Sequence, residues 1–243
     1  MGIFNAAKKI RDKTYPRCAV VVAAAGSSVR MGHDKLQMDL GGVPVLCRTL
    51  QALDKAELVD EIVVAAREDN ILAVADLCAR AGLHKSVKVV KGGKTRAESV
   101  LCGALEFSER TELIAVHDGA RPLVKAEDVD RLIREGNKTY AVAPAIPVRD
   151  TIKVADENGL VRSTPDRDTL FAVQTPQVFQ ADLLKAALQA ALNEGVQVTD
   201  DCAAVERIGK EVYLTEGDPE NIKITTPTDL ALAETILRQR GQL

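Results

Sequence analysis

The stretch V-V-V-A-A-A-G-S-S-V-R-M-G-H-D-K, residues 20–35, decides how the fold of this chain is interpreted. Its unbroken run of small and β-branched apolar residues is typical of a strand buried on both faces of a parallel sheet. After that run, the Ala-Ala-Gly of residues 24–26 leaves the backbone uncovered, so that successive N–H groups can surround an anion. Arg30 then adds a planar fork and Lys35 a point charge, both suited to phosphate oxygens. The stretch predicts a buried strand that delivers a polyphosphate-binding loop.

Two better-known phosphate loops are absent from the sequence. A dinucleotide fingerprint beginning at Gly26 requires glycines at positions 28 and 31, which are serine and methionine. A Walker A motif would use the G-K-T of residues 93–95, but its first glycine would fall at Lys88. The remaining alternative for the opening stretch is an ordinary strand-to-helix turn with incidental surface cations.

The chain is long enough for one sizeable α/β domain, and its length alone would permit two. Because it contains no repeat, no low-complexity tract and no second hydrophobic core, we expect one domain. The 243 residues are 46% apolar and include no tryptophan, so we expect a core of Val, Leu, Ile and Ala. A net charge of −3 argues against nucleic acid as the main partner. The five cysteines are scattered and form no C-x-x-C pair, which favours reduced thiols in the cytoplasm and provides no zinc-binding spacing.

Residues 1–17 differ from the rest of the chain, because lysines and arginines there alternate with apolar residues at roughly helical spacing. The segment has no apolar run of signal-peptide length, and no span of the chain is long enough to cross a bilayer. A weak membrane-surface helix is the alternative. We expect a basic N-terminal extension on a domain of residues 18–243, with no membrane as a partner.

Strands and helices alternate after the opening loop, as in a mostly parallel sheet covered by helices. A second glycine loop, Gly92-Gly93, ends the third strand and leads through Arg96 and Ser99 into a helix. Because the carboxyl ends of parallel strands meet at one edge, the two loops are expected to share a ligand. A plain turn with solvated charges is the alternative. Further strands are expected over 61–66, 86–90, 113–116, 140–146, 211–214 and 221–224, and helices over 71–80, 129–136 and 182–193.

The fourth strand is followed by H-D-G-A-R-P at residues 117–122. Asp118, at the carboxyl end of a parallel strand and near phosphate-binding cations, can hold a divalent metal that bridges phosphates. Arg121 can pair with that carboxylate or with a phosphate. Capping of a turn is the alternative for Asp118, and His117 is expected to pack and hydrogen-bond rather than catalyse.

Residues 147–166 contain two short β runs around Asn158-Gly159, the signal for a two-stranded hairpin. An isolated hairpin is marginally stable in water, so this β-arm is expected to pack on another surface, with a second copy of the chain as the natural partner. Beyond it, Lys223 lies in a short apolar run, with a solvated surface cation as its alternative. Thr226-Pro227 is typical of a helix start.

Six ordered motifs together resemble the 2-C-methyl-D-erythritol 4-phosphate cytidylyltransferases, from about Cys18 to the last residue. They are A-A-A-G-S-S-V-R-M-G-H-D-K, G-G-K-T-R-A-E-S-V, H-D-G-A-R-P, P-V-R-D-T-I-K, Q-T-P-Q-V-F and E-G-D-P-E-N-I-K-I-T-T-P. The resemblance implies a Rossmann-like nucleotidyltransferase domain, a homodimer joined by a protruding β-arm, and transfer of CMP from CTP to methylerythritol phosphate in the non-mevalonate isoprenoid route. We expect no fused downstream enzyme after the last helix.

The same resemblance implies roles for individual residues. Catalytic roles fall to Arg30, Lys35, Arg167 and Lys223. CTP binding falls to Ala24, Ala25, Gly26, Gly93, Arg96, Ser99 and Asp118, with Asp118 also beside Mg²⁺. Substrate binding falls to Thr151, Arg121 and Thr175, and Thr151 and Arg167 are expected to reach the site of the partner subunit.

Three other functions stay open at this point. Ribitol-5-phosphate cytidylyltransferases have a similar fold and opening loop, and differ in the sugar phosphate that they accept. A guanylyltransferase acting on molybdenum cofactor shares R-M-G and D-K but leaves Arg167, Thr175 and the arm unexplained. A nucleotide-sensing protein that kept the loops would bind CTP without magnesium-dependent release of pyrophosphate.

Overall fold

Strand β1, Cys18–Ala24, is the strand predicted from the opening stretch, and it lies inside the sheet. It runs parallel to β4, Val59–Ala66, on one side and to β6, Leu113–Asp118, on the other. The computed structural model describes residues 15–26 and 35–243. Arg30 and most of the expected N-terminal extension lie outside these ranges.

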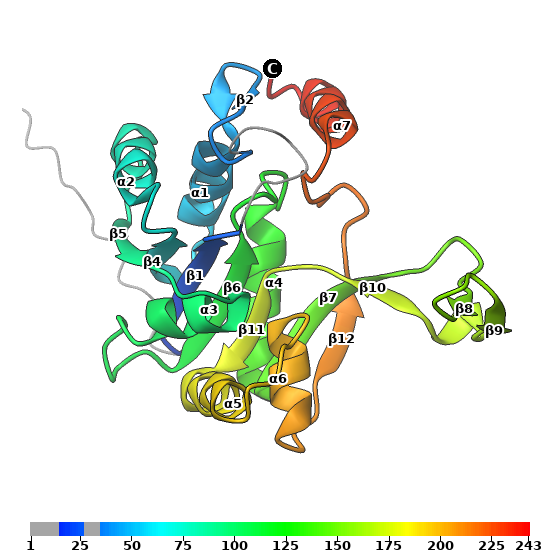
Figure 1. Cartoon of the computed structure of the whole chain (residues 1–243). Helices are drawn as coiled ribbons and strands as arrows, with labels where there is room; N and C mark the ends of the chain where they lie inside the picture. Colours follow the sequence, from blue (N-terminus) through cyan, green and yellow to red (C-terminus); the bar gives the residue numbers. More distant parts are fainter. Residues whose placement is uncertain (1–14, 27–34) are drawn as a thin grey trace, which may run out of the picture.

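The main sheet is mostly parallel, as predicted, and has the strand order β10-β7-β11-β6-β1-β4-β5, with β12 also paired to β7 (Figure 1). The pairs β1–β4, β1–β6, β4–β5 and β7–β12 are parallel, whereas β11 and β10 pair antiparallel with their neighbours. The remaining strands of this sheet are β5 (Ser86–Lys91), β7 (Ala141–Pro147), β10 (Phe171–Val173), β11 (Gln177–Gln180) and β12 (Tyr213–Glu216).

Alternating residues of β1 face two different hydrophobic clusters. Val20 and Val22 pack with α1, α2 and α4, whereas Ala19 and Val21 pack with α3, α5 and α6. Helices thus cover both faces of the sheet. Its central strands are apolar on both sides, and each side must be buried. These helices are α1 (Val45–Lys55), α2 (Ile71–Arg80), α3 (Arg96–Ala104), α4 (Ala126–Thr139), α5 (Ala181–Asn193) and α6 (Asp201–Arg207).

The C-terminal helix α7, Pro227–Gln239, begins at the predicted site, since Thr226 and Asp229 form a capping box ahead of the proline. It packs in a third cluster near the short hairpin of β2 (Asp39–Leu40) and β3 (Val43–Pro44). Residues 221–224, expected as a strand, form none. Instead the segment crosses the edge of the sheet, and Ile224 N donates to Ala120 O over 2.9 Å.

The predicted end of α4 at Gly136 is wrong. The helix continues to Thr139 and ends at Tyr140, whose φ is 64°. Gly136 lies within the helix, where an added Cβ would come within 2.6 Å of Val178 Cγ1. The glycine is thus explained by the close packing of α4 on β11 rather than by a helix end.

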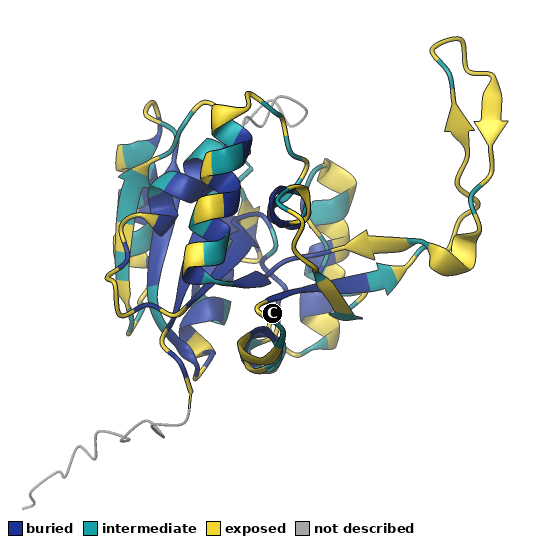
Figure 2. Cartoon of the chain, turned by 90° about the horizontal axis from the view of Figure 1, so that it is seen from below, coloured by how far each residue is buried: buried dark blue, intermediate teal, exposed yellow. Residues whose placement is uncertain are grey.

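The predicted β-arm protrudes from the body of the fold (Figures 1 and 2). Its hairpin consists of β8, Val154–Ala155, and β9, Val161–Ser163, and all residues of both strands are exposed. The arm returns to the sheet through a 3₁₀ turn at Arg167–Thr169. No helix in the described part of the chain is long and apolar enough to cross a membrane.

Candidate active site

A cavity of about 820 Å³ opens at the carboxyl ends of β1, β4, β5 and β6. Both glycine loops line it, as the sequence analysis predicted, whereas binding of a shared ligand stays a prediction. The predicted site residues that line the cavity are Ala24, Ala25, Gly26, Lys35, Gly93, Arg96, Ser99, Asp118 and Lys223.

The other predicted site residues lie elsewhere. Arg30 is outside the described residues. Thr151 and Arg167 are exposed on the arm, where Arg167 Nη1 donates to Arg149 O over 3.3 Å. Arg121 and Thr175 are not among the residues that line the cavity, and lie directly behind Asp118.

The second glycine loop packs closely against the first at Gly92, where there is no room for a side chain. A Cβ at Gly92 would lie 2.8 Å from Ser99 Oγ and 3.0 Å from Ala25 Cβ, so a side chain there would push the two loops apart. Ser99 Oγ accepts from Gly93 N over 3.0 Å and donates to Thr95 O over 2.8 Å. Ser99 is therefore already engaged in shaping the loop that the sequence assigned to the cytidine side.

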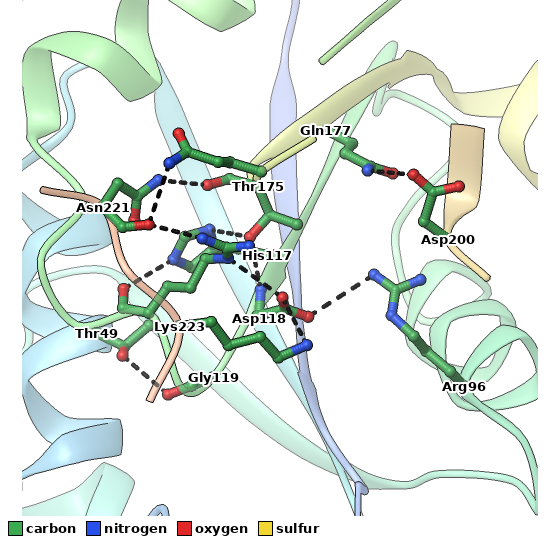
Figure 3. A network of polar contacts seen from close by, with 12 residues as sticks. Thr49, Arg96, His117, Asp118, Gly119, Thr175, Gln177, Asp200, Asn221 and Lys223 are labelled. Carbon is green, nitrogen blue, oxygen red and sulfur yellow. Dashed lines mark hydrogen bonds and ion pairs between the residues drawn. The ribbon is translucent and has the colours of Figure 1, made fainter. Parts of the chain in front are cut away.

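Asp118 is the last residue of β6 and lies at the cavity wall among three cations (Figure 3). Its Oδ2 lies 3.0 Å from Lys223 Nζ and 3.3 Å from Arg121 Nε, and its Oδ1 lies 3.9 Å from Arg96 Nη2. Burial raises the pKa of this carboxyl, but Lys223, Arg96 and Arg121 outweigh that effect and lower the pKa to about 2. Asp118 is thus a fixed anion at neutral pH.

Behind Asp118, His117 is completely buried and makes two hydrogen bonds, as predicted for a packing residue. Thr175 Oγ1 lies 3.0 Å from Nδ1, and Arg121 O lies 3.1 Å from Nε2. Because a carbonyl can only accept, Nε2 carries the proton, and Nδ1 accepts from the threonine hydroxyl. That hydroxyl in turn accepts from Asp118 N over 3.1 Å. A neutral histidine therefore fixes the backbone at Asp118.

The segment before α7 closes this arrangement from the other side (Figure 3). Asn221 Nδ2 donates to Thr175 O over 2.8 Å, and Asn221 O accepts from Arg121 Nη1 over 2.6 Å. Three motifs that are distant in sequence thus meet around Asp118, and Lys223 is carried to the cavity by the same segment. Asn221 was not singled out by the sequence analysis, although it lies two residues before Lys223.

The burial of His117 predicts how the stability of the fold depends on pH. Burial lowers the pKa of His117 from 6.5 to about 4, so the unfolded chain binds this proton at a higher pH than the folded chain. As the pH is lowered from 6.5 to 4, protonation of this histidine in the unfolded chain is expected to reduce the free energy of unfolding by about 1.4 kcal/mol per pH unit. Urea unfolding of wild type and His117→Gln at several pH values measures the slope.

Replacement of exposed His84 by glutamine is the control, and it should leave the extra slope in place. Parallel stability curves for wild type and His117→Gln would contradict the assignment of a neutral buried His117.

A buried carboxylate that was not predicted from the sequence lies behind Arg96, at the start of α6. Asp201 is completely buried, and its Oδ2 lies 2.7 Å from Arg96 Nη1. Burial raises the pKa of this carboxyl, and the charge of Arg96 opposes the rise. The T-D-D at residues 199–201 is a helix-start signal that could have located α6, since Asp200 accepts from Ala203 N over 2.9 Å.

A divalent metal in this cavity would need oxygen ligands from a bound substrate as well as from the described residues. Among residues 15–26 and 35–243, no three His, Cys, Asp or Glu side chains are grouped to hold a metal. Mg²⁺ usually binds through one or two carboxylates together with substrate phosphates and water. Asp118 can supply one carboxylate oxygen, Oδ1, since Oδ2 pairs with Lys223 and Arg121, if a triphosphate in the cavity supplies further oxygens.

Over nearly its whole length the chain is similar to proteins of one family. A family model described as IspD, 2-C-methyl-D-erythritol 4-phosphate cytidylyltransferase, matches residues 18–239. A curated relative with that enzyme name, from Caldanaerobacter subterraneus subsp. tengcongensis, is 43% identical over 91% of this chain and 99% of its own length. Another, from Desulforamulus reducens, is 41% identical over 91% of this chain and 96% of its own length. The crystal structure of 4-diphosphocytidyl-2C-methyl-D-erythritol synthase from Anaerococcus prevotii is similar with a TM-score of 0.82 at 31% identity, covering 92% of this chain and 99% of that chain.

Proposed function

This chain belongs to the 2-C-methyl-D-erythritol 4-phosphate cytidylyltransferase family, and we propose that its cavity performs the corresponding reaction. The enzyme transfers CMP from CTP to 2-C-methyl-D-erythritol 4-phosphate and releases pyrophosphate, a step of the non-mevalonate isoprenoid pathway. One observation carries the proposal beyond the family match: Asp118, a fixed anion among three cations, lines a cavity formed by two glycine loops.

In this reaction a phosphate oxygen of the sugar phosphate forms a bond to the α-phosphorus of CTP. The bond from that phosphorus to the β-phosphate oxygen breaks, and pyrophosphate leaves with the electron pair. A phosphate monoester has its second pKa near 6 and is mostly dianionic at neutral pH, so the nucleophile needs no general base.

Catalysis then depends on alignment and charge. Lys35 and Arg30 hold the triphosphate, together with backbone N–H groups of residues 24–26. Gly93, Arg96 and Ser99 form the cytidine side, and Lys223 with Arg167 holds the sugar phosphate in line. Asp118 would hold Mg²⁺, which, when bound, neutralises charge that develops on the phosphates.

We further propose that the arm joins two copies of the chain. Its exposed apolar side chains support this, since Ile152, Val154, Leu160 and Val161 are 39–58% exposed in the single chain. Thr151 and Arg167 would then complete the site of the partner subunit, while Arg121 and Thr175 support Asp118 beneath the sugar phosphate. Residues 18–243 act as one catalytic domain, and five cysteines without a disulfide support a cytoplasmic location.

The central test is magnesium-dependent pyrophosphate release from CTP, with methylerythritol phosphate and ribitol 5-phosphate offered in parallel. Strong preference for methylerythritol phosphate is expected. Preference for ribitol phosphate would retain the phosphate chemistry and reject the substrate assignment. CTP binding without release from either mixture would instead indicate a nucleotide sensor.

Replacement of Arg167 by alanine is expected to raise KM for the sugar phosphate about tenfold or more, because a guanidinium binds phosphate through two parallel hydrogen bonds. The KM for CTP should change little. Steady-state kinetics with each substrate varied in turn measures both values. Arg162→Ala is the control, since Arg162 lies on the same arm and pairs with Asp156 over 2.6 Å. An unchanged KM would remove Arg167 from the substrate site.

Mixed dimers test whether the arm reaches the partner. Arg167→Ala chains contribute an intact cavity, and Lys223→Ala chains contribute an intact arm, so a mixed dimer contains one complete site. Random mixing should therefore restore about a quarter of wild-type activity from two impaired proteins. Activity no higher than the mean of the two parents would show that each arm serves its own cavity.

A further inference from the structure

Asp201 gives Arg96 a second carboxylate partner, outside the cavity. Arg96 lines the cavity, and its guanidinium lies between Asp201, at 2.7 Å, and Asp118, at 3.9 Å. Asp201 is not among the cavity-lining residues and is completely buried. The arginine thus pairs more closely with a carboxylate that no ligand in the cavity would contact.

The position of Asp201 is fixed by a side chain of the sheet. Gln177, on β11, accepts at Oε1 from the backbone N–H groups of Asp201 and Cys202, each over 3.2 Å. The other end of its amide donates from Nε2 to Asp200 Oδ2 over 2.8 Å. A buried side chain therefore anchors the first turn of α6 and places the Asp201 carboxylate against Arg96.

This arrangement affects how strongly Arg96 engages Asp118. The attraction between opposite charges increases as their distance decreases, and it is stronger in a poorly solvated site. Arg96 would compete with a metal ion for the Asp118 carboxylate if it approached within hydrogen-bond distance. The closer carboxylate of Asp201 opposes that approach.

We propose that Asp201 is a positioning residue, which holds the Arg96 guanidinium away from Asp118 Oδ1. Because Lys223 and Arg121 already pair with Oδ2, Oδ1 is the oxygen that this arrangement leaves available to the divalent cation that accompanies CTP. The inference rests on the proposed function, because it assumes that CTP and its cation bind in this cavity. It assigns a role to α6, a helix that contributes no residue to the lining of the cavity.

The test measures CTP binding by titration calorimetry on the full chain, once with Mg²⁺ and once with EDTA. The dissociation constant measured with EDTA, divided by the constant measured with Mg²⁺, reports how strongly the cation promotes CTP binding. In Asp201→Asn, which preserves side-chain size, this ratio is expected to fall about tenfold, within the range for residues that share one ion-pair network. Glu206→Gln, which removes an exposed charge from the same helix, should leave the ratio within about twofold of wild type.

A second substitution separates positioning from general damage. In the double variant Asp201→Asn/Arg96→Gln the competing cation is removed, so the ratio should return to within about threefold of wild type. Thermal melts of each variant show that the compared proteins are folded.

An unchanged ratio in Asp201→Asn, or no recovery in the double variant, would overturn the positioning role while leaving the proposed function intact. Wild-type protein that binds CTP equally with and without Mg²⁺ would also overturn it. Absence of CTP binding by wild type would instead reject the proposed function itself.

Discussion

Replacing Asp118 with asparagine is expected to lower kcat by about 10³-fold, the loss associated with removing a preorganised charge contact together with a metal ligand. The substitution preserves size but removes the one anion that Lys223, Arg121 and Arg96 surround. Because the pKa of Asp118 is about 2, the carboxyl is ionised at every pH used for the assay. The deficit should therefore be the same at pH 6 and pH 9.

The measurement is pyrophosphate release at saturating CTP and sugar phosphate, over a range of Mg²⁺ concentrations. Asp54→Asn is the matched control, because Asp54 is also buried and hydrogen-bonded, accepting from His84 N over 3.0 Å and from Lys85 N over 2.8 Å. It does not line the cavity, so it should lower stability while retaining kcat per folded molecule. Near wild-type kcat in Asp118→Asn would exclude Asp118 from metal binding and from catalysis.

The parts of the fold that were predictable are those encoded by local patterns. The apolar run in β1 predicted a strand buried on both faces, and Asn158-Gly159 predicted the hairpin of the arm. The insertion of β11 between β6 and β7, antiparallel to both, was not predicted. Pairing between distant strands depends on tertiary packing, which a short apolar run does not encode.

The site shows the same division. Residues at the ends of strands were predictable, because parallel strands bring their carboxyl ends to one edge, and Asp118 and both glycine loops do line the cavity. Lys223 also lines it, although its segment forms no strand. Asp201 could not be inferred in the same way, since its relation to Arg96 depends on α6 packing across the opposite face of the sheet from α1.

The second large effect is expected at Lys35, where substitution by alanine should lower kcat by roughly 10²-fold or more. Lys35 follows the opening loop and lines the same cavity as Ala24 and Gly26. A positive charge there would stabilise negative charge on the triphosphate more strongly in the transition state than in bound CTP. For that reason kcat should fall more than the affinity for CTP.

Pre-steady-state measurement of CMP transfer, with CTP affinity determined separately, distinguishes these two effects. Lys88→Ala is the matched control, because Lys88 pairs with Glu106 outside the cavity and its side chain is 57% exposed. That variant should transfer CMP at the wild-type rate. If Lys35→Ala lost CTP affinity while keeping its rate at saturation, Lys35 would bind ground state and transition state equally. Catalytic charge stabilisation at the opening loop would then rest on Arg30, and Arg30→Ala should show the loss of kcat that Lys35→Ala lacked.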